Sequence, residues 1–114
     1  MNKPLKKLQA RFYVSPGGRE PVREWLKDLP IDCKKLIGTD IATAEYGWPI
    51  GMPTCKSLGK GLFEIRTDLP DKTISRVIFS VVDSEIMLLH GFIKKTQKTP
   101  KHDLDLALDR LREA

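Results

Sequence analysis

Three consecutive strand-length segments, joined by very short connections, constrain the fold of this chain most strongly. Residues 62–67 alternate between apolar and polar positions, and residues 74–83 and 85–94 are strand-length segments rich in apolar and β-branched residues, which is typical of strands. Only residues 68–72 and the pair 83–84 connect them. Because connections this short join antiparallel neighbours, the second half of the chain is predicted to form a three-stranded meander.

The first half of the chain predicts one short strand and two helices. A strand over residues 11–15 is followed by the turn sequence 15–18, Ser-Pro-Gly-Gly. Pro21 fits the first position of a helix that ends at Leu29, before a proline. A second helix is expected from a cap at Asp32 to about Tyr46. Its buried side would hold Leu36, Ile37, Ile41 and Ala44.

The chain is expected to end in a helix, with Thr99 as its cap and Pro100 at its first position. The element order is therefore β-α-α-β-β-β-α. We expect an α+β domain, with a small antiparallel sheet of about four strands and helices packed on one face. Residues 1–114 suit a single domain, in which residues 1–10 form a leader of marginal order.

Composition limits the partners that this chain could have. The formal net charge is +5, which favours an anionic partner, with nucleic acid first and an acidic protein second. Cys33 and Cys55 belong to no metal-binding spacing, and neither a metal nor a cofactor is expected. With no secretory leader and no apolar run of about 20 residues, the chain is predicted to be cytoplasmic and without a membrane partner.

One face of the predicted meander carries an unusual set of polar groups. Side chains alternate across a strand, so one face is nearly all apolar and should carry the helices. The opposite face collects an acid, two guanidinium groups, an imidazole, an aromatic ring and an amine: Glu64, Arg66, Arg76, His90, Phe92 and Lys94. This set is either the ordinary solvated face of an antiparallel sheet or a site for an anionic ligand.

If this face is a site for an anionic ligand, its groups fit the cleavage of an RNA phosphodiester. That reaction needs a base for the ribose 2′-hydroxyl, fixed cations around the phosphorus and an acid for the leaving oxygen. Arginine binds phosphate in a bidentate way, and an aromatic ring can stack on a base. His90 is either a general base or a structural histidine beside Gly91. Glu64 is either a base or the partner that orients an arginine.

Two basic segments flank this face. Lys94, Lys95, Lys98 and Lys101 lie at the junction between the last strand and the last helix, where helix amides add affinity for anions. Lys56 and Lys60 precede the meander, next to glycines that permit close approach of a ligand or simply a bend. A solvated loop is the alternative for the lysine run.

Three segments resemble the HigB-like, phage-related branch of the RelE toxin superfamily. They are LGKGLFEIR at 58–66, SRVIF at 75–79 and LLHGFIKKTQKTP at 88–100, and the similarity spans about residues 12–108. The resemblance implies the toxin of a type II toxin–antitoxin pair. Such toxins cut mRNA on the ribosome without metal and leave a 2′,3′-cyclic phosphate. It also implies an antitoxin partner, usually a helix-turn-helix protein.

The resemblance, together with the pattern of the polar face and of the basic segments, predicts roles for individual residues. Arg66, Arg76, His90, Lys94 and Lys95 would be catalytic. A further set, Lys56, Lys60, Glu64, Phe92 and Lys98, would bind the substrate. Many RelE-type toxins carry a tyrosine near the C-terminus, whereas this chain has none after Tyr46, so the proton donor would be Lys94, Lys95 or His90. The alternative is a non-catalytic module that binds nucleic acid or an antitoxin through the same basic surface.

Overall fold

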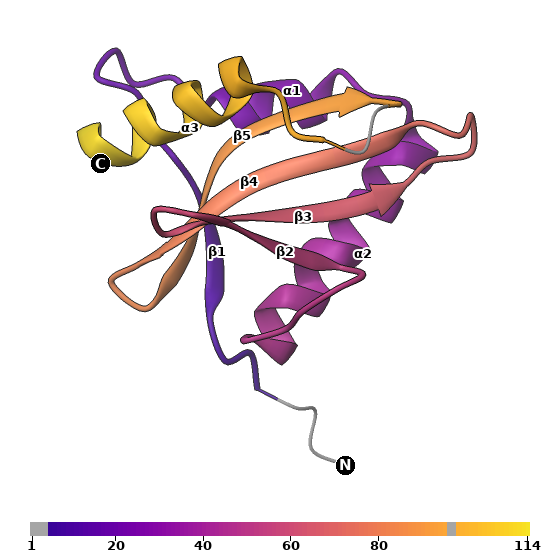
Figure 1. Ribbon diagram of the computed structural model, residues 1–114, viewed down its shortest axis with the longest axis horizontal. Helices are drawn as coiled ribbons and strands as arrows, with labels where there is room; N and C mark the ends of the chain where they lie inside the picture. Colours follow the sequence, from indigo (N-terminus) through magenta and orange to yellow (C-terminus); the bar gives the residue numbers. More distant parts are fainter. Residues whose placement is uncertain (1–4, 96–97) are drawn as a thin grey trace.

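The computed structural model describes residues 5–95 and 98–114 and shows an α+β fold (Figure 1). Within these residues there are five strands and three helices, in the order β-α-α-β-β-β-β-α. The strands are β1 (Gln9–Phe12), β2 (Cys55–Gly59), β3 (Leu62–Asp68), β4 (Ile74–Val82) and β5 (Glu85–Lys94). The helices are α1 (Pro21–Lys27), α2 (Ile31–Gly47) and α3 (Lys101–Glu113). No helix of the described residues is long and apolar enough to cross a membrane.

The sheet differs in two respects from the predicted four-stranded antiparallel one. Its strand order is β1-β5-β4-β3-β2, and β1 pairs with β5 in parallel, so the sheet is mixed. The extra strand is β2, which lies before the predicted meander in a segment where the sequence predicted no strand. It pairs with β3 through Lys56 opposite Glu64 and ends at the tight Gly59–Gly61 turn, where all three residues have positive φ.

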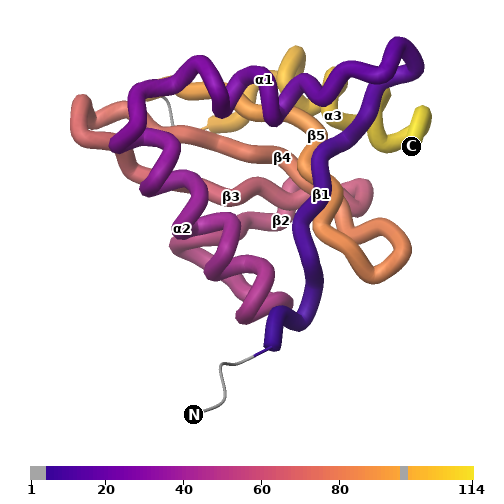
Figure 2. Tube along the Cα trace, turned by 180° about the vertical axis from the view of Figure 1, so that it is seen from behind, coloured from indigo at the N-terminus to yellow at the C-terminus, as the bar shows by residue number. Residues whose placement is uncertain are grey.

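Helices cover both faces of the sheet, which corrects the expectation that they pack on one face. α1 and α2 cross one face (Figure 2), and α3 lies across the other (Figure 1). The apolar residues of α3 explain its position, because Leu104, Leu108 and Leu111 pack against a second apolar cluster that includes Ile78 and Met87. The face that was predicted to be open is therefore partly covered.

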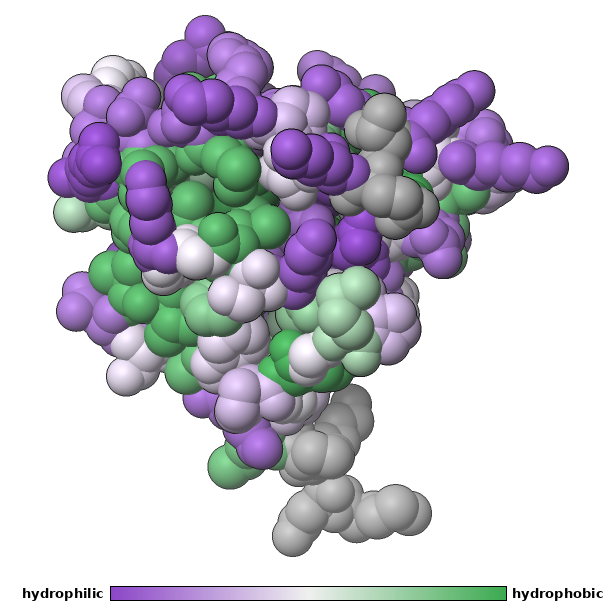
Figure 3. Space-filling model, viewed as in Figure 1, coloured by the Kyte–Doolittle hydropathy of each residue, from purple (hydrophilic) through white to green (hydrophobic). Residues whose placement is uncertain are grey.

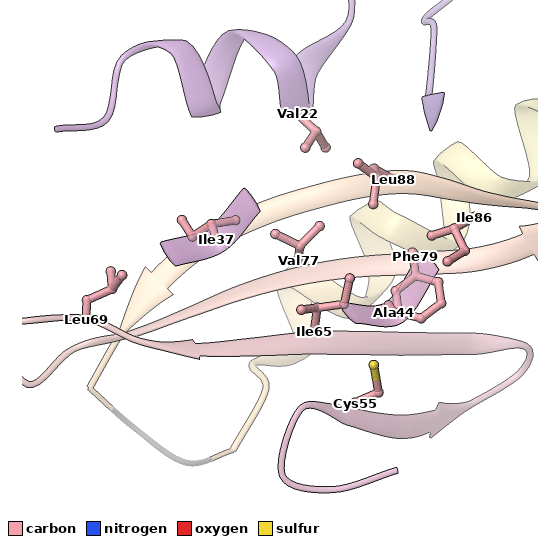
Figure 4. Close-up of a cluster of buried hydrophobic side chains, with 10 residues drawn as sticks. All are labelled: Val22, Ile37, Ala44, Cys55, Ile65, Leu69, Val77, Phe79, Ile86 and Leu88. Atoms are coloured by element: carbon pink, nitrogen blue, oxygen red, sulfur yellow. The ribbon is translucent and has the colours of Figure 1, made fainter. Parts of the chain in front are cut away.

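The main core lies between the sheet and the pair α1–α2 (Figure 4). The predicted apolar face of β3 and β4 is confirmed, since Ile65, Val77 and Phe79 are fully buried in this core and Phe63 packs against it. In α2, Ile37 and Ala44 are buried as expected. Leu36 was expected on the same side, but it is 40 % exposed and lines a pocket beside β3.

A β-bulge in β5 changes which of its side chains share a face. Ile78 of β4 pairs with His90, whereas the next residue, Phe79, pairs with Leu88, so Leu89 is an extra residue. Such an insertion reverses the alternation of side chains beyond it. Consequently Met87 and Leu89 pack beneath α3 on the same face as His90, although the sequence pattern placed them on the opposite one.

The ends of the helices also differ from the caps expected in the sequence. α2 begins at Ile31 with Pro30 in the capping position, so Asp32 lies inside the first turn, where its carboxylate accepts a hydrogen bond from the amide of Cys33. α3 begins at Lys101, with Pro100 in the capping position. Thr99 does not cap this helix, because its hydroxyl donates to Glu64 instead. The leader is anchored in part: the amides of Lys7 and Leu8 both donate to the carbonyl of Glu45, while residues 1–4 lie outside the described residues.

Candidate functional site

The predicted polar groups of the sheet lie in two adjacent rows beneath the start of α3. Arg66 of β3 pairs in register with Arg76 of β4, which pairs with Phe92 of β5. In the neighbouring row, Glu64 is aligned through Ile78 with His90. Side chains opposite one another on the same face of an antiparallel sheet have Cβ atoms about 5 Å apart. Strand pairing alone therefore brings the two guanidinium groups side by side.

Glu64 is a fully buried carboxylate held by groups from two different elements. Its Oε1 lies 3.5 Å from Nε of Arg66, and its Oε2 accepts a 2.6 Å hydrogen bond from the hydroxyl of Thr99. A buried charge is stable only when it is paired or hydrogen-bonded. These contacts favour the second of the two roles expected for Glu64, that of a group that orients an arginine. They also join the segment before α3 to the centre of the sheet.

Arg76 is the largest fully buried side chain in the described residues. Burial lowers the pKa of its guanidinium, the negative charge of Glu64 opposes that change, and the charge of Arg66 adds to it. A guanidinium stays protonated in proteins even so, because its ordinary pKa lies far above neutral pH. Two fixed positive charges from Arg66 and Arg76 thus lie next to one buried carboxylate.

His90 forms a pair with Asp103, a residue in the first turn of α3. Nε2 of His90 lies 2.7 Å from Oδ1 of Asp103 and donates a proton to it. This bond fixes the tautomer of a neutral ring, in which Nδ1 is the remaining acceptor. Burial lowers the pKa of His90, although the hydrogen bond to Asp103 acts in the opposite direction. The imidazole is therefore neutral near pH 7 and has the form of a general base.

Lys94 is the exposed cation of the candidate site, next to the pair formed by His90 and Asp103. Its Nζ lies 3.7 Å from Oδ2 of Asp103 and 6.0 Å from the centre of the Phe92 ring. The Phe92 ring stacks on His90 with centroids 5.5 Å apart and is only 8 % exposed. Phe92 was expected to offer an open surface for a base. In this arrangement the ring instead packs among the basic groups.

Some of the residues that were predicted to belong to the site lie apart from the group around Glu64, Arg76 and His90. Lys60 lies at the tip of the β2–β3 turn, where it adds to the lowering of the Asp105 pKa that a hydrogen bond from Lys101 mainly causes. Lys95 lies toward Asp71 in the β3–β4 turn, whose pKa is lowered mainly by hydrogen bonds from Thr73. Lys56 is exposed beside Glu64 at the margin, and Lys98 is exposed before α3. Thr96 and Gln97 of the basic segment lie outside the described residues.

Two residues of the site, Thr99 and Asp103, were missed in the sequence. The sequence does contain a signal for Asp103. This residue lies four positions before Ala107 and eight before Leu111, and so falls on the apolar stripe of α3. A carboxylate on a buried stripe needs a partner, and His90 and Lys94 are the partners. No group of three or more potential metal ligands occurs within residues 5–95 and 98–114.

Figure 3 shows the side of the molecule on which α3 lies. Hydrophilic side chains cover much of its upper part, and an apolar area lies next to them. The groups within reach of solvent in the site are Lys94, whose side chain is 45 % exposed, His90 at 15 % and Arg66 at 12 %. A ligand arriving from solvent would meet these three before the buried Arg76.

All residues of the candidate site lie within a region of the chain that matches a known family. Residues 24–112 match the profile described as Phage derived protein Gp49-like (DUF891), a toxin–antitoxin-associated family related to RelE-like toxins. The chain belongs to this Gp49-like family. A comparison with curated proteins gave no match.

Proposed function

We propose that this protein is the toxin of a type II toxin–antitoxin pair and acts as an RNA endonuclease. The observation that carries the proposal is the convergence of Arg66, Arg76, His90 and Lys94 on one face, with two carboxylates that orient them. Membership of a toxin–antitoxin-associated family supports the biological class. The resemblance of the 58–66, 75–79 and 88–100 segments to HigB-like RelE toxins supports mRNA on the ribosome as the substrate.

The geometry fits attack by the ribose 2′-hydroxyl on the adjacent phosphorus. His90, held through Nε2 by Asp103, takes the hydroxyl proton on Nδ1. The new 2′-oxygen–phosphorus bond and the breaking bond to the 5′-oxygen leave a 2′,3′-cyclic phosphate. Lys94 is the exposed ammonium that donates a proton to the leaving oxygen. No metal ion is required for these steps.

The arginines supply the electrostatic part of the mechanism. Negative charge grows on the non-bridging oxygens during attack, and fixed donors there are worth about 3–4 kcal/mol. Arg66 reaches solvent and would contact the phosphate, while Arg76 lies behind it and raises the local positive potential. Glu64 and Thr99 hold the Arg66 guanidinium in place. The partners implied by this function are mRNA on the ribosome and a helix-turn-helix antitoxin.

The burial of Arg76 and Glu64 favours a second candidate, a non-catalytic module. In that case the buried charges form a structural network, and the exposed lysines bind nucleic acid or an antitoxin. The two candidates differ in whether the unmodified protein cleaves RNA at all.

The experiment that separates them is primer extension on a defined message with purified ribosomes. We expect the unmodified protein to cut the message, and His90→Ala to reduce the rate by about 100-fold or more. Lys27→Ala is the control, because Lys27 is an exposed cation at the end of α1, on the opposite face of the sheet. Absence of cleavage by the unmodified protein, together with salt-sensitive RNA binding, would support the non-catalytic module instead.

A further inference from the structure

The position of His90 depends on the β-bulge at the residue before it, Leu89. Leu88 is buried in the main core between the sheet and the pair α1–α2, whereas His90 lies on the opposite face, beneath α3. In a regular strand, residues two positions apart lie on the same face. Because Leu89 is an extra residue in β5, Leu88 and His90 can lie on opposite faces. Without the bulge, either Leu88 would leave the core or His90 would leave the candidate site.

Arg110 of α3 binds the backbone of this bulge. Its Nη1 donates a 2.8 Å hydrogen bond to the carbonyl oxygen of Leu89. Leu89 has no partner residue in β4, and a backbone carbonyl covered by a helix needs a donor. A charged donor such as a guanidinium forms a stronger hydrogen bond than a neutral one. Arg110 therefore stabilises the position of β5 at which the pairing with β4 is interrupted.

Two other residues restrict the side chain of Arg110. Its guanidinium lies over the ring of Tyr13, 5.8 Å from the ring centre. The Tyr13 hydroxyl in turn donates a hydrogen bond to Glu113, about one turn farther along α3. Tyr13 directly follows β1 and is buried. These contacts limit the directions in which Arg110 can point and hold its Nη1 toward β5.

α3, which lies across the sheet (Figure 1), thus binds two consecutive residues of β5. Asp103 binds the imidazole of His90, and Arg110 binds the carbonyl of Leu89. Asp103 and Arg110 are separated by about two turns of helix, so their side chains lie on the same side of α3. The first hydrogen bond orients the ring, and the second fixes the backbone from which the ring extends.

We propose that Arg110 is the positioning residue of His90. By stabilising the bulge at Leu89, it keeps the imidazole within reach of Asp103 and on the face that carries Arg66. Arg110 does not contact the reacting groups. Its effect on cleavage rests on the proposed function, whereas its effect on the orientation of His90 does not.

The test is the tautomer of His90 in the full chain, measured by NMR from the nitrogen chemical shifts of the imidazole at pH 7.5. We expect the Nε2–H tautomer alone in the unmodified protein, because Nε2 donates to Asp103. In Arg110→Met the ring should lose this bond and show a mixture of both neutral tautomers. His102, which is exposed on α3, is the internal reference for a ring without a fixed tautomer.

Arg110→Lys separates the loss of the contact from the loss of the charge, and it decides the question if Arg110→Met does not fold. Lysine keeps the charge, but its ammonium ends short of the position of Nη1, so the same mixture of tautomers is expected. Arg112→Met is the matched control and should keep the single tautomer, because Arg112 is an exposed arginine of the same helix that lies 3.9 Å from Asp109. A single Nε2–H tautomer in either folded Arg110 variant, even at a lowered melting temperature, would overturn the proposal.

Message cleavage provides the second measurement. Arg110→Met should lower kcat by about tenfold or more and change KM by less than about twofold, because a displaced base slows proton transfer while Arg66 and Lys94 still bind the substrate. A raised KM with unchanged kcat would contradict the positioning role. If the unmodified protein cuts no message, the proposed function fails, but the tautomer of His90 still decides the role of Arg110. Full cleavage by a variant with mixed tautomers would support the role of Arg110 and refute His90 as the base.

Discussion

The indole ring of Trp25, on α1, lies directly against the backbone of Gly91, on β5. A Cβ added at residue 91 would lie 2.4 Å from two ring carbons of Trp25, well inside any allowed contact. Gly91 separates His90 from Phe92, so the position of the indole determines how closely α1 approaches the strand that carries the site. The absence of a side chain at residue 91 is thus a packing requirement.

We predict that Gly91→Ala lowers the free energy of unfolding by about 1–3 kcal/mol, because the ring of Trp25 must move in a packed core. Urea unfolding measures this loss. Gly38→Ala is the control, since a Cβ at residue 38 of α2 would meet no atom within 4 Å. That change should raise stability by up to about 1 kcal/mol, as alanine is the better helix former. Equal stability of Gly91→Ala and the unmodified protein would show that the indole contact is not restrictive.

Arg76 is expected to be essential for cleavage. Arg76→Ala should lower the rate of message cleavage by about two to three orders of magnitude, because a fixed positive charge near the reacting phosphate is lost. Since Arg76 is fully buried next to Glu64, its removal also leaves a buried carboxylate less well compensated and should lower the melting temperature.

The rate loss is therefore compared with that of Arg76→Lys at a temperature where both variants are folded by circular dichroism. Lysine retains the charge but not the planar guanidinium, so Arg76→Lys should fold and still cleave poorly. Arg23→Ala, at an exposed position of α1, should cleave normally. Full activity of both Arg76 variants would place the reaction elsewhere on the molecule.

His90 should make stability depend on pH in the mildly acidic range. Burial lowers its folded-state pKa below the ordinary value of about 6.5, so the unfolded chain binds a proton more readily than the folded protein. The free energy of unfolding is unaffected by this group above about pH 6.5 and falls as the pH drops below that value. His90→Gln should flatten this part of the profile, as measured by urea unfolding between pH 7.5 and 5.5.

His102 offers a matched control for this measurement, because the chain has two histidines and His102 is exposed on α3. His102→Gln should change the profile far less than His90→Gln, because the charge of His102 is the smallest cause of the lowered His90 pKa. A profile that His90→Gln leaves unchanged would mean that burial of the imidazole does not disfavour its protonation.

Binding to RNA should weaken steeply with salt, because each neutralised phosphate releases counterions. Lys94 and Lys56 are two of the exposed cations on the face of the site, so Lys94→Gln and Lys56→Gln should each reduce the slope of log affinity against log salt by about 1. Lys27→Gln, at the end of α1 on the opposite face, should leave the slope unchanged. An affinity that does not vary between low and moderate salt would contradict an electrostatic site on this face.

Much of the fold was predictable because local patterns specify local elements. The alternation in β3 and β4 correctly predicted the side of the sheet that carries Arg66 and Arg76. The same reasoning failed in β5, where one extra residue at Leu89 reverses the alternation. A bulge forms from the mismatch between two paired strands, and therefore a pattern within one strand does not reveal it.

The sequence by itself determined the α+β class, the order of the helices and of the meander, and the presence of Glu64, Arg66 and Arg76 on a single face, because side-chain periodicity follows from backbone geometry alone. Only the tertiary structure decided that β1 pairs in parallel with β5, that α3 covers the polar face and that Asp103 meets His90. These features depend on surfaces that form once distant segments have packed together. α3 packs on this face because apolar side chains from several strands together form one surface there. Burial of that surface stabilises the packing, and no single segment of the sequence contains the whole surface.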